Sequence, residues 1–232
     1  MSQGAADLIV AELKRRPDLL LCASAGGTPT GAYERLAARR ARQPRLFEKM
    51  RVLQIDEWGG LPPDNPATCQ ADLQAKLLGP LGIEAARYRG FRSDAPDARG
   101  ECERMAQWLA KNGPIDLCLL GLGINGHVAM NEPGETGTPH AHVATLAWSS
   151  LKHGMLQCLK RKPRYGLTLG LGDILGSRKI LLVASGQSKQ AALKRLLEPR
   201  VTTRFPASFL WLHPDVTVLY DRLAAPLRPY EN

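Results

Sequence analysis

"IDLCLLGLGINGHVAMNEPGE", residues 115–135, joins an apolar run to a glycine turn, and this junction decides the fold. Residues 115–123 read as a buried strand. "GLGING" satisfies the GxGxxG pattern of dinucleotide-binding folds, but Pro133 disrupts the helix that should follow, and "HAHVATLAW", about 20 residues on, has no acid. We therefore exclude a nicotinamide site and interpret the glycines as a turn that presents His127.

Similar junctions recur along the chain. Short apolar runs that predict strands lie at 19–25, 51–58, 115–123, 179–186, 208–212 and 216–221, and amphipathic runs that predict helices lie at 29–41, 68–78 and 189–197. Alternating strands and helices indicate an α/β fold with a mainly parallel sheet covered on both faces. In such folds ligands bind beyond the carboxyl ends of the strands, where this chain places its unusual residues.

Composition limits the class of protein. The chain has 232 residues, 44% hydrophobic and 23% charged, so we expect one globular domain over residues 1–232 that folds alone or as a homo-oligomer. No apolar run is long enough to span a bilayer, and the amphipathic start is unlike a signal peptide. We expect a cytoplasmic protein with no membrane partner.

The net charge of +9 raises the possibility of nucleic-acid binding, because a basic face attracts phosphate. The basic clusters at 39–45 and 160–164 lack interleaved aromatic residues and a helix-turn-helix pattern, so a solvated surface is the better interpretation. The five cysteines have no CxxC spacing, and His140 and His142 lack a third ligand at zinc spacing. We therefore expect neither a disulfide nor a metal site.

Two stretches are candidate phosphate sites. In "SAGGTPTG", Gly26 and Gly27 let backbone amides approach a ligand, and Thr28 is placed to cap the following helix. Lys189 begins a predicted helix, where an anionic ligand would offset the unfavourable position of a cation. The alternatives are a capped tight turn and a solvated lysine.

Titratable side chains follow two strands. Asp56 and Glu57 directly follow the apolar part of the run at 51–58. Side chains alternate between the two faces of a strand, so one of the two carboxylates should point towards the cleft, where it is a candidate general base. His127 follows the glycine turn, and Glu132 is near enough in sequence to orient its imidazole. The alternative for the two carboxylates is a pair of surface acids.

The motifs "GGTP", "DEWGGLP", "GLGINGHVAMNEPG" and "LTLGLGDIL…SGQSK" occur in this order over most of the chain. Together they resemble the family that includes glucosamine-6-phosphate deaminase and 6-phosphogluconolactonase. Through "NEPGE" and "PASFLWLH" the chain is most similar to the galactosamine-6-phosphate isomerase branch. The resemblance implies a Rossmann-like three-layer sandwich and conversion of an amino-aldose phosphate to a ketose phosphate and ammonia, without metal or cofactor.

The resemblance also implies roles for individual residues. Asp56 would move the proton between C2 and C1, and His127 with Glu132 would open the sugar ring. Gly26, Gly27, Thr28 and Lys189 would bind the phosphate.

The chain departs from the pattern of the family at three places. Asn125 stands where the glucosamine enzymes typically have aspartate, which favours galactosamine 6-phosphate as substrate and tagatose 6-phosphate as product. The N-terminal segment is short, and an arginine expected to bind phosphate has no clear counterpart near "SSLKHGML". Glucosamine-6-phosphate deaminase, a 6-phosphogluconolactonase hydrolase and a non-catalytic sugar-phosphate sensor are the alternatives.

Overall fold

The structure, a computed structural model, describes residues 1–134 and 136–226. Its strands are β1 (Leu20–Ala23), β2 (Arg51–Gln54), β3 (Asp56–Gly59), β4 (Tyr88–Arg89), β5 (Leu117–Gly121), β6 (His142–Ala144), β7 (Tyr165–Thr168), β8 (Lys179–Ala184) and β9 (Val216–Tyr220). The α-helices are α1 (Ser2–Arg15), α2 (Thr30–Arg42), α3 (Cys69–Leu73), α4 (Gly79–Leu81), α5 (Ala98–Asn112), α6 (Leu171–Leu175) and α7 (Gln190–Leu196). A π-helical turn, Gln74–Leu78, joins α3 to α4, and short 3₁₀ turns include Ser150–Lys152, Gly154–Leu156, Gln187–Lys189 and Pro206–Leu212.

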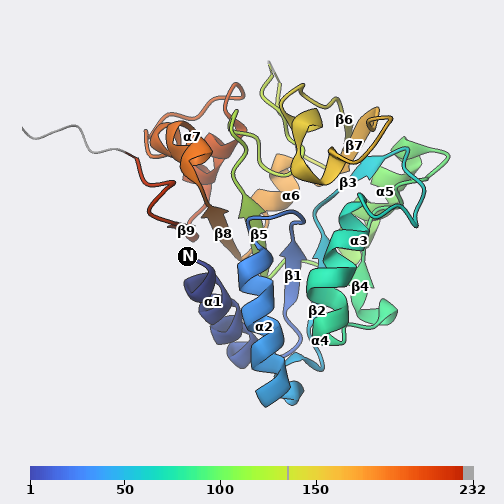
Figure 1. Ribbon diagram of the computed structural model, residues 1–232, viewed down its shortest axis with the longest axis vertical. Helices are drawn as coiled ribbons and strands as arrows, with labels where there is room; N and C mark the ends of the chain where they lie inside the picture. Colours follow the sequence, from blue (N-terminus) through green and yellow to red (C-terminus); the bar gives the residue numbers. More distant parts are fainter. Residues whose placement is uncertain (135, 227–232) are drawn as a thin grey trace, which may run out of the picture.

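Six strands form a parallel sheet in the order β4-β2-β1-β5-β8-β9. From β1 the chain builds outward to one edge through β2 and β4, and it later returns to build the other half through β5, β8 and β9 (Figure 1). The carboxyl ends of β1 and β5 therefore flank the point at which the winding reverses, where open α/β sheets bind ligands.

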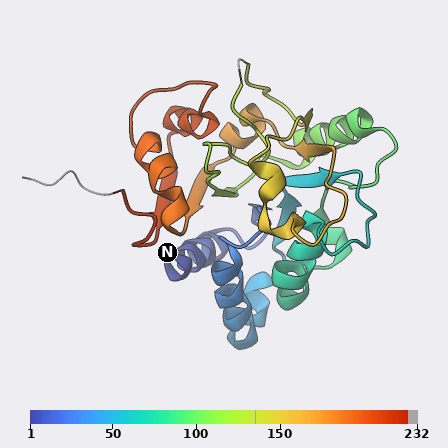
Figure 2. The same cartoon turned by 45° about the horizontal axis from the view of Figure 1, so that its top comes forward.

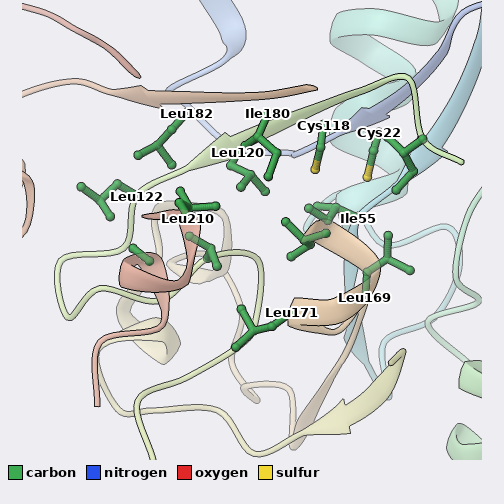
Figure 3. Packing of buried hydrophobic residues seen from close by; sticks show 14 of the residues in the cluster. Cys22, Ile55, Cys118, Leu120, Leu122, Leu169, Leu171, Ile180, Leu182 and Leu210 are labelled. Atoms are coloured by element: carbon green, nitrogen blue, oxygen red, sulfur yellow. The ribbon is translucent and has the colours of Figure 1, made fainter. Parts of the chain in front are cut away.

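Alternate side chains of the strands build two hydrophobic cores. Leu21, Leu119 and Leu181 face α1, α2 and the helical segment 69–81, whereas Cys22, Leu120 and Leu182 face α5, α6 and α7 (Figures 1 and 3). Burial on both faces is why these strands are continuous apolar runs. The predicted α/β sandwich of three layers is confirmed.

A second sheet contains the antiparallel strands β3, β7 and β6. The run at 51–58, which the sequence presents as one strand, divides between the two sheets at Ile55. There the Ile55 amide donates to Ala23 of β1 at 3.2 Å, and the Ile55 carbonyl accepts from the Leu169 amide at 2.9 Å. Asp56 is consequently the first residue of a new strand rather than the end of the first one.

Two other predictions need correction. Residues 208–212 lie in a 3₁₀ segment and not in a strand, because Pro206 begins a helical turn whose Ala207 amide donates to the Gly126 carbonyl at 2.8 Å. Thr28 does not cap α2, since the N-cap position is Pro29 and the Thr30 hydroxyl donates to the Gly26 carbonyl at 2.9 Å.

All five cysteines are free, and four of them are buried. No helix in the described part of the chain is both long and apolar enough to cross a membrane.

Candidate active site

A cavity of about 560 Å³ opens beyond the carboxyl ends of β1 and β5. Its wall on the other side comes from β3 and from the segment 148–155, which lies beside β3 over the sheet in Figure 2. The side chains and turns that bring chemistry to it are Gly27, Thr28, Asp56, His127, Ser149, Ser150, Lys152, His153, Ser188 and Lys189. Groups from five separate stretches of sequence thus meet in one place.

Asp56 lines this cavity from the start of β3, where it pairs with Thr168 of β7. Burial, and secondly the negative charge of Glu57, raise the pKa of Asp56 from 3.8 to about 7, against a lowering hydrogen bond from Cys69. A carboxyl group whose pKa is near neutrality can both accept and return a proton at physiological pH. Asp56 therefore has the position and the acidity of a general base.

Glu57 points the opposite way, as strand alternation predicts. Its side chain is fully buried and accepts hydrogen bonds from the Trp58 and Cys69 amides at 2.7 Å, from the Gln70 amide at 2.8 Å and from the Gln54 side chain at 2.9 Å. Two of these amides belong to the start of α3, where a carboxylate is favoured by the helix dipole. Glu57 thus fixes β3 to α3 and holds a negative charge behind Asp56.

The glycine turn before His127 is required by close packing. A side chain at Gly123 would approach the His127 ring to about 2.5 Å, and one at Gly126 would approach the Phe205 ring to about 2.0 Å. Gly126 also has a φ of +88°, which only glycine adopts readily. The turn closes with the Gly123 amide donating to the His127 carbonyl at 2.9 Å. It directs the imidazole into the cavity, as the sequence predicts.

Glu132 lies beside the imidazole. Its Oε2 is 3.4 Å from His127 Nδ1 and accepts a hydrogen bond of 2.9 Å from the Asn125 side chain, while its Oε1 accepts from the Ser150 hydroxyl and the Ala147 amide. Burial acts to raise the pKa of Glu132, but the hydrogen bond and charge of His127, with the bonds from Ser150 and Asn125, outweigh it and lower the pKa to about 2. Glu132 is thus a stable anion that can hold a protonated imidazole.

Asn125 acts on this cluster through Glu132. Its Nδ2 donates to Glu132 and, at 3.3 Å, to the Ser149 hydroxyl, and its Oδ1 accepts from the His127 backbone amide at 3.1 Å. These bonds orient the carboxylate and close the turn. The contacts of Asn125 therefore make it a positioning residue.

The four candidate phosphate-binding residues differ in their availability to a ligand. Gly27, Thr28 and Lys189 line it. The amide of Gly26 already donates to the Asp72 carboxylate at 2.9 Å, so it is not free for a phosphate. Burial lowers the pKa of Lys189, and its amine forms no ion pair with any carboxylate of the described residues. Gly26 shapes the turn, whereas the other three residues are exposed to the cavity.

Several residues of the site were not predicted from the sequence. Ser150 bridges Glu132 and His127, with its hydroxyl 3.4 Å from Nδ1. His153 lines the cavity beside the turn at Gly26, and the Lys152 amine lies 3.3 Å from the centre of the exposed Trp148 ring. All four belong to "WSSLKH", the stretch in which the sequence has no clear counterpart of the arginine expected to bind phosphate. The described residues contain no group of three or more histidine, cysteine or carboxylate side chains placed to hold a metal ion.

Comparisons with known proteins identify the family and the fold of this chain. The family described as "Glucosamine-6-phosphate isomerases/6-phosphogluconolactonase" matches residues 1–219. The chain is 38% identical over 221 residues to the Escherichia coli protein named "Putative deaminase AgaI", covering 95% of this chain and 88% of that protein. It is 36% identical to glucosamine-6-phosphate deaminase 1 of Bacillus subtilis, covering 99% and 96%.

Solved structures show the same fold. A monomeric glucosamine-6-phosphate deaminase of the NagB superfamily superposes with a TM-score of 0.90 at 35% identity, covering 96% of this chain and 93% of that one. The 6-phosphogluconolactonase of Trypanosoma brucei superposes with a TM-score of 0.75 at 21% identity, covering 96% and 92%, which is a likeness of fold.

Proposed function

Because this chain belongs to the glucosamine-6-phosphate isomerase/6-phosphogluconolactonase family, we propose that it converts galactosamine 6-phosphate to tagatose 6-phosphate and ammonia. The protein is an enzyme of the hexosamine-6-phosphate deaminase and isomerase type. Our proposal adds the galacto epimer and the roles of individual residues.

The observation that carries the proposal is that Asp56, His127 and Lys189 line one cavity. A hexosamine 6-phosphate has its phosphate at one end and its reactive carbons, C1 and C2, at the other. The cation of Lys189 with the turn at Gly27 and Thr28 binds the phosphate, and the carboxyl of Asp56 meets the reactive carbons.

The reaction needs three kinds of proton transfer, and the site offers a group for each. His127, charge-stabilised by Glu132, moves the proton that opens the ring at the ring oxygen. Asp56 removes the C2 proton of the open aldehyde while O1 takes up a proton from water, giving an enolamine, and Asp56 then returns its proton to C1, giving an imine at C2. Water adds to C2, a proton passes from the added oxygen to the nitrogen, and the C2–N bond breaks to release ammonia and leave the ketose.

The galacto preference rests on Asn125 and on the resemblance to galactosamine-type members. With Asn125 in place of an aspartate, Glu132 is the carboxylate in contact with the imidazole. The glucosamine epimer is the alternative substrate, as the names of several relatives indicate.

An ammonia-release assay with galactosamine 6-phosphate and glucosamine 6-phosphate, both in the presence of a chelator, tests the proposal. We expect faster release from the galacto epimer. Faster release from glucosamine 6-phosphate would refute the epimer preference, and release from neither would refute the deaminase mechanism. A parallel assay with 6-phosphogluconolactone distinguishes a lactonase, which would hydrolyse the lactone and release no ammonia from either sugar.

A further inference from the structure

His153 occupies the phosphate end of the cavity, and neither the sequence motifs nor the proposed reaction gives it a role. Its imidazole packs on the turn after β1, where Cε1 and Nε2 each lie 3.3 Å from the position that a side chain at Gly26 would take. Its other neighbour is the Trp58 ring, whose centre is 5.9 Å away. The ring therefore lies against the turn at Gly26, in the cavity that Gly27 and Thr28 also line.

The hydrogen bonding of the ring orients its free nitrogen. The Met155 amide donates to Nδ1 at 3.4 Å, so Nδ1 acts as an acceptor in the unliganded protein. The proton of the neutral imidazole is then on Nε2, which is the atom beside the Gly26 turn. Nε2 thus offers a hydrogen-bond donor to a ligand on Gly27 and Thr28.

The charges around His153 are mainly positive. They are Lys189 before α7, Lys76 of the π-helical turn, His127 after β5 and Asp72 of α3. Asp72 forms an ion pair with Lys76, which also donates to the Gly26 carbonyl at 3.3 Å. Partial burial, followed by the charges of Lys189 and His127, lowers the pKa of His153. An imidazole in this setting gains a proton most readily when an anion arrives.

We propose that His153 binds the phosphate of the substrate through Nε2, so that affinity for the phosphate ester decreases as the pH rises through neutrality. The inference rests on the proposed function for the place of the phosphate. A phosphate monoester is a dianion above about pH 7, and its charge favours the doubly protonated imidazole beside it. The second proton goes to Nδ1, so the long 3.4 Å hydrogen bond from the Met155 amide is given up when the imidazolium forms. Binding therefore takes up a proton from solvent. At higher pH the imidazolium is lost, and this loss weakens binding.

Binding of galactitol 6-phosphate, measured by calorimetry, tests this inference without turnover. This compound has neither a carbonyl group to isomerise nor an amine to titrate, so binding reports on the phosphate end. The variants are His153→Gln, which removes the cation, and His153→Arg, which keeps a cation at every pH of the experiment. His140→Gln is the matched control, because His140 is exposed and paired with Asp173 outside the cavity.

We expect His153→Gln to weaken binding about tenfold at about pH 6.5 and about twofold at about pH 8.5, from the size of hydrogen bonds to charged groups. The affinity of His153→Arg should be within about threefold of that of the wild type at pH 6.5, and it should lack the decrease with rising pH that His153 causes in the wild type. Asp56 and Lys189 also titrate in this cavity and contribute to the pH dependence of affinity in every variant. The contribution of His153 is therefore taken as the difference in pH dependence between the His153 variants and His140→Gln.

Two outcomes would overturn the inference. One is unchanged affinity in His153→Gln at both pH values, and the other is an identical pH dependence in His153→Gln and in the wild type. Failure of the proposed function looks different, because the wild type would bind galactitol 6-phosphate with this pH dependence and yet release no ammonia. Absence of any binding by the folded wild type would overturn both.

Discussion

Replacing Asp56 by asparagine should abolish turnover and at the same time stabilise the fold. The carboxyl group lies in a cavity wall beside the buried Glu57, where its charged form is disfavoured. Asparagine has nearly the same shape and carries no charge, so it removes the unfavourable charge together with the base. A catalytic group held at a cost in stability predicts this opposite response of activity and stability.

The magnitude follows from the pKa of Asp56. A rise from 3.8 to about 7 corresponds to about 4 kcal/mol at roughly 1.4 kcal/mol per unit, which water in the open cavity reduces to about 2 to 4 kcal/mol. Between pH 3.8 and about pH 7, the Asp56 carboxyl group binds more protons in the native state than in the unfolded state. Stability of the wild type therefore falls as the pH rises through this interval.

Urea unfolding followed by circular dichroism, at about pH 8 and about pH 5, measures the effect. We expect Asp56→Asn to be more stable than the wild type at pH 8 and to lose more than half of this advantage at pH 5, where the native carboxyl is protonated. Asp64→Asn, at an exposed loop position, is the control and should show neither effect. A stability difference between Asp56→Asn and the wild type that is equal at the two pH values would refute the reasoning.

The activity of the wild type and of two other variants, and the stability of a third, give further tests. The rate of ammonia release in the wild type should fall about tenfold per pH unit below about pH 7, as Asp56 becomes protonated; a flat profile would exclude Asp56 as the base. Glu132→Gln should lower kcat about 10- to 100-fold with little change in KM, because the imidazolium loses a charged partner; a change in KM alone would contradict this role. Lys189→Met should raise KM about tenfold or more and spare kcat at saturation, and an unchanged KM would remove it from the phosphate site. Asn125→Asp should lower the free energy of unfolding by about 1 kcal/mol at neutral pH, since it sets a carboxylate against Glu132; equal urea midpoints would show that the two do not interact.

The sequence predicts the central strands β1, β2, β5 and β8 because they are buried on both faces. The two-residue edge strand β4 is only half-buried and has no apolar run that would predict it. Runs such as 179–186 contain little but apolar residues, and burial in two cores leaves few alternatives. The second sheet is not predictable in this way. The run at 51–58 continues without a break in hydrophobicity, and the change of sheet at Ile55 depends on contacts with β1 and with Leu169. The point at which the chain passes from one sheet to the other therefore depends on pairing with strands that are distant in sequence.

The residues of the site likewise differ in how far the sequence predicts them, because some are placed by local turns and others by tertiary packing. His127 and Glu132 are identifiable because a local glycine turn and a short loop bring them together. Ser150 and His153 lie in a segment of short 3₁₀ turns without periodicity, so their neighbours depend on how that segment packs over β3. Their residue types alone are too common to indicate a role.

The change of sheet at Ile55 also bears on which sugars can react. The turn proposed to bind phosphate follows β1 of the parallel sheet, whereas Asp56, the proposed base, begins β3 of the antiparallel sheet. The proposed function therefore makes the spacing between the two sheets the distance from phosphate to base, and it predicts that a sugar phosphate one carbon shorter presents a different atom to Asp56. Under this proposal the junction between the sheets selects for chain length, a form of selectivity that requires no contact with any hydroxyl group.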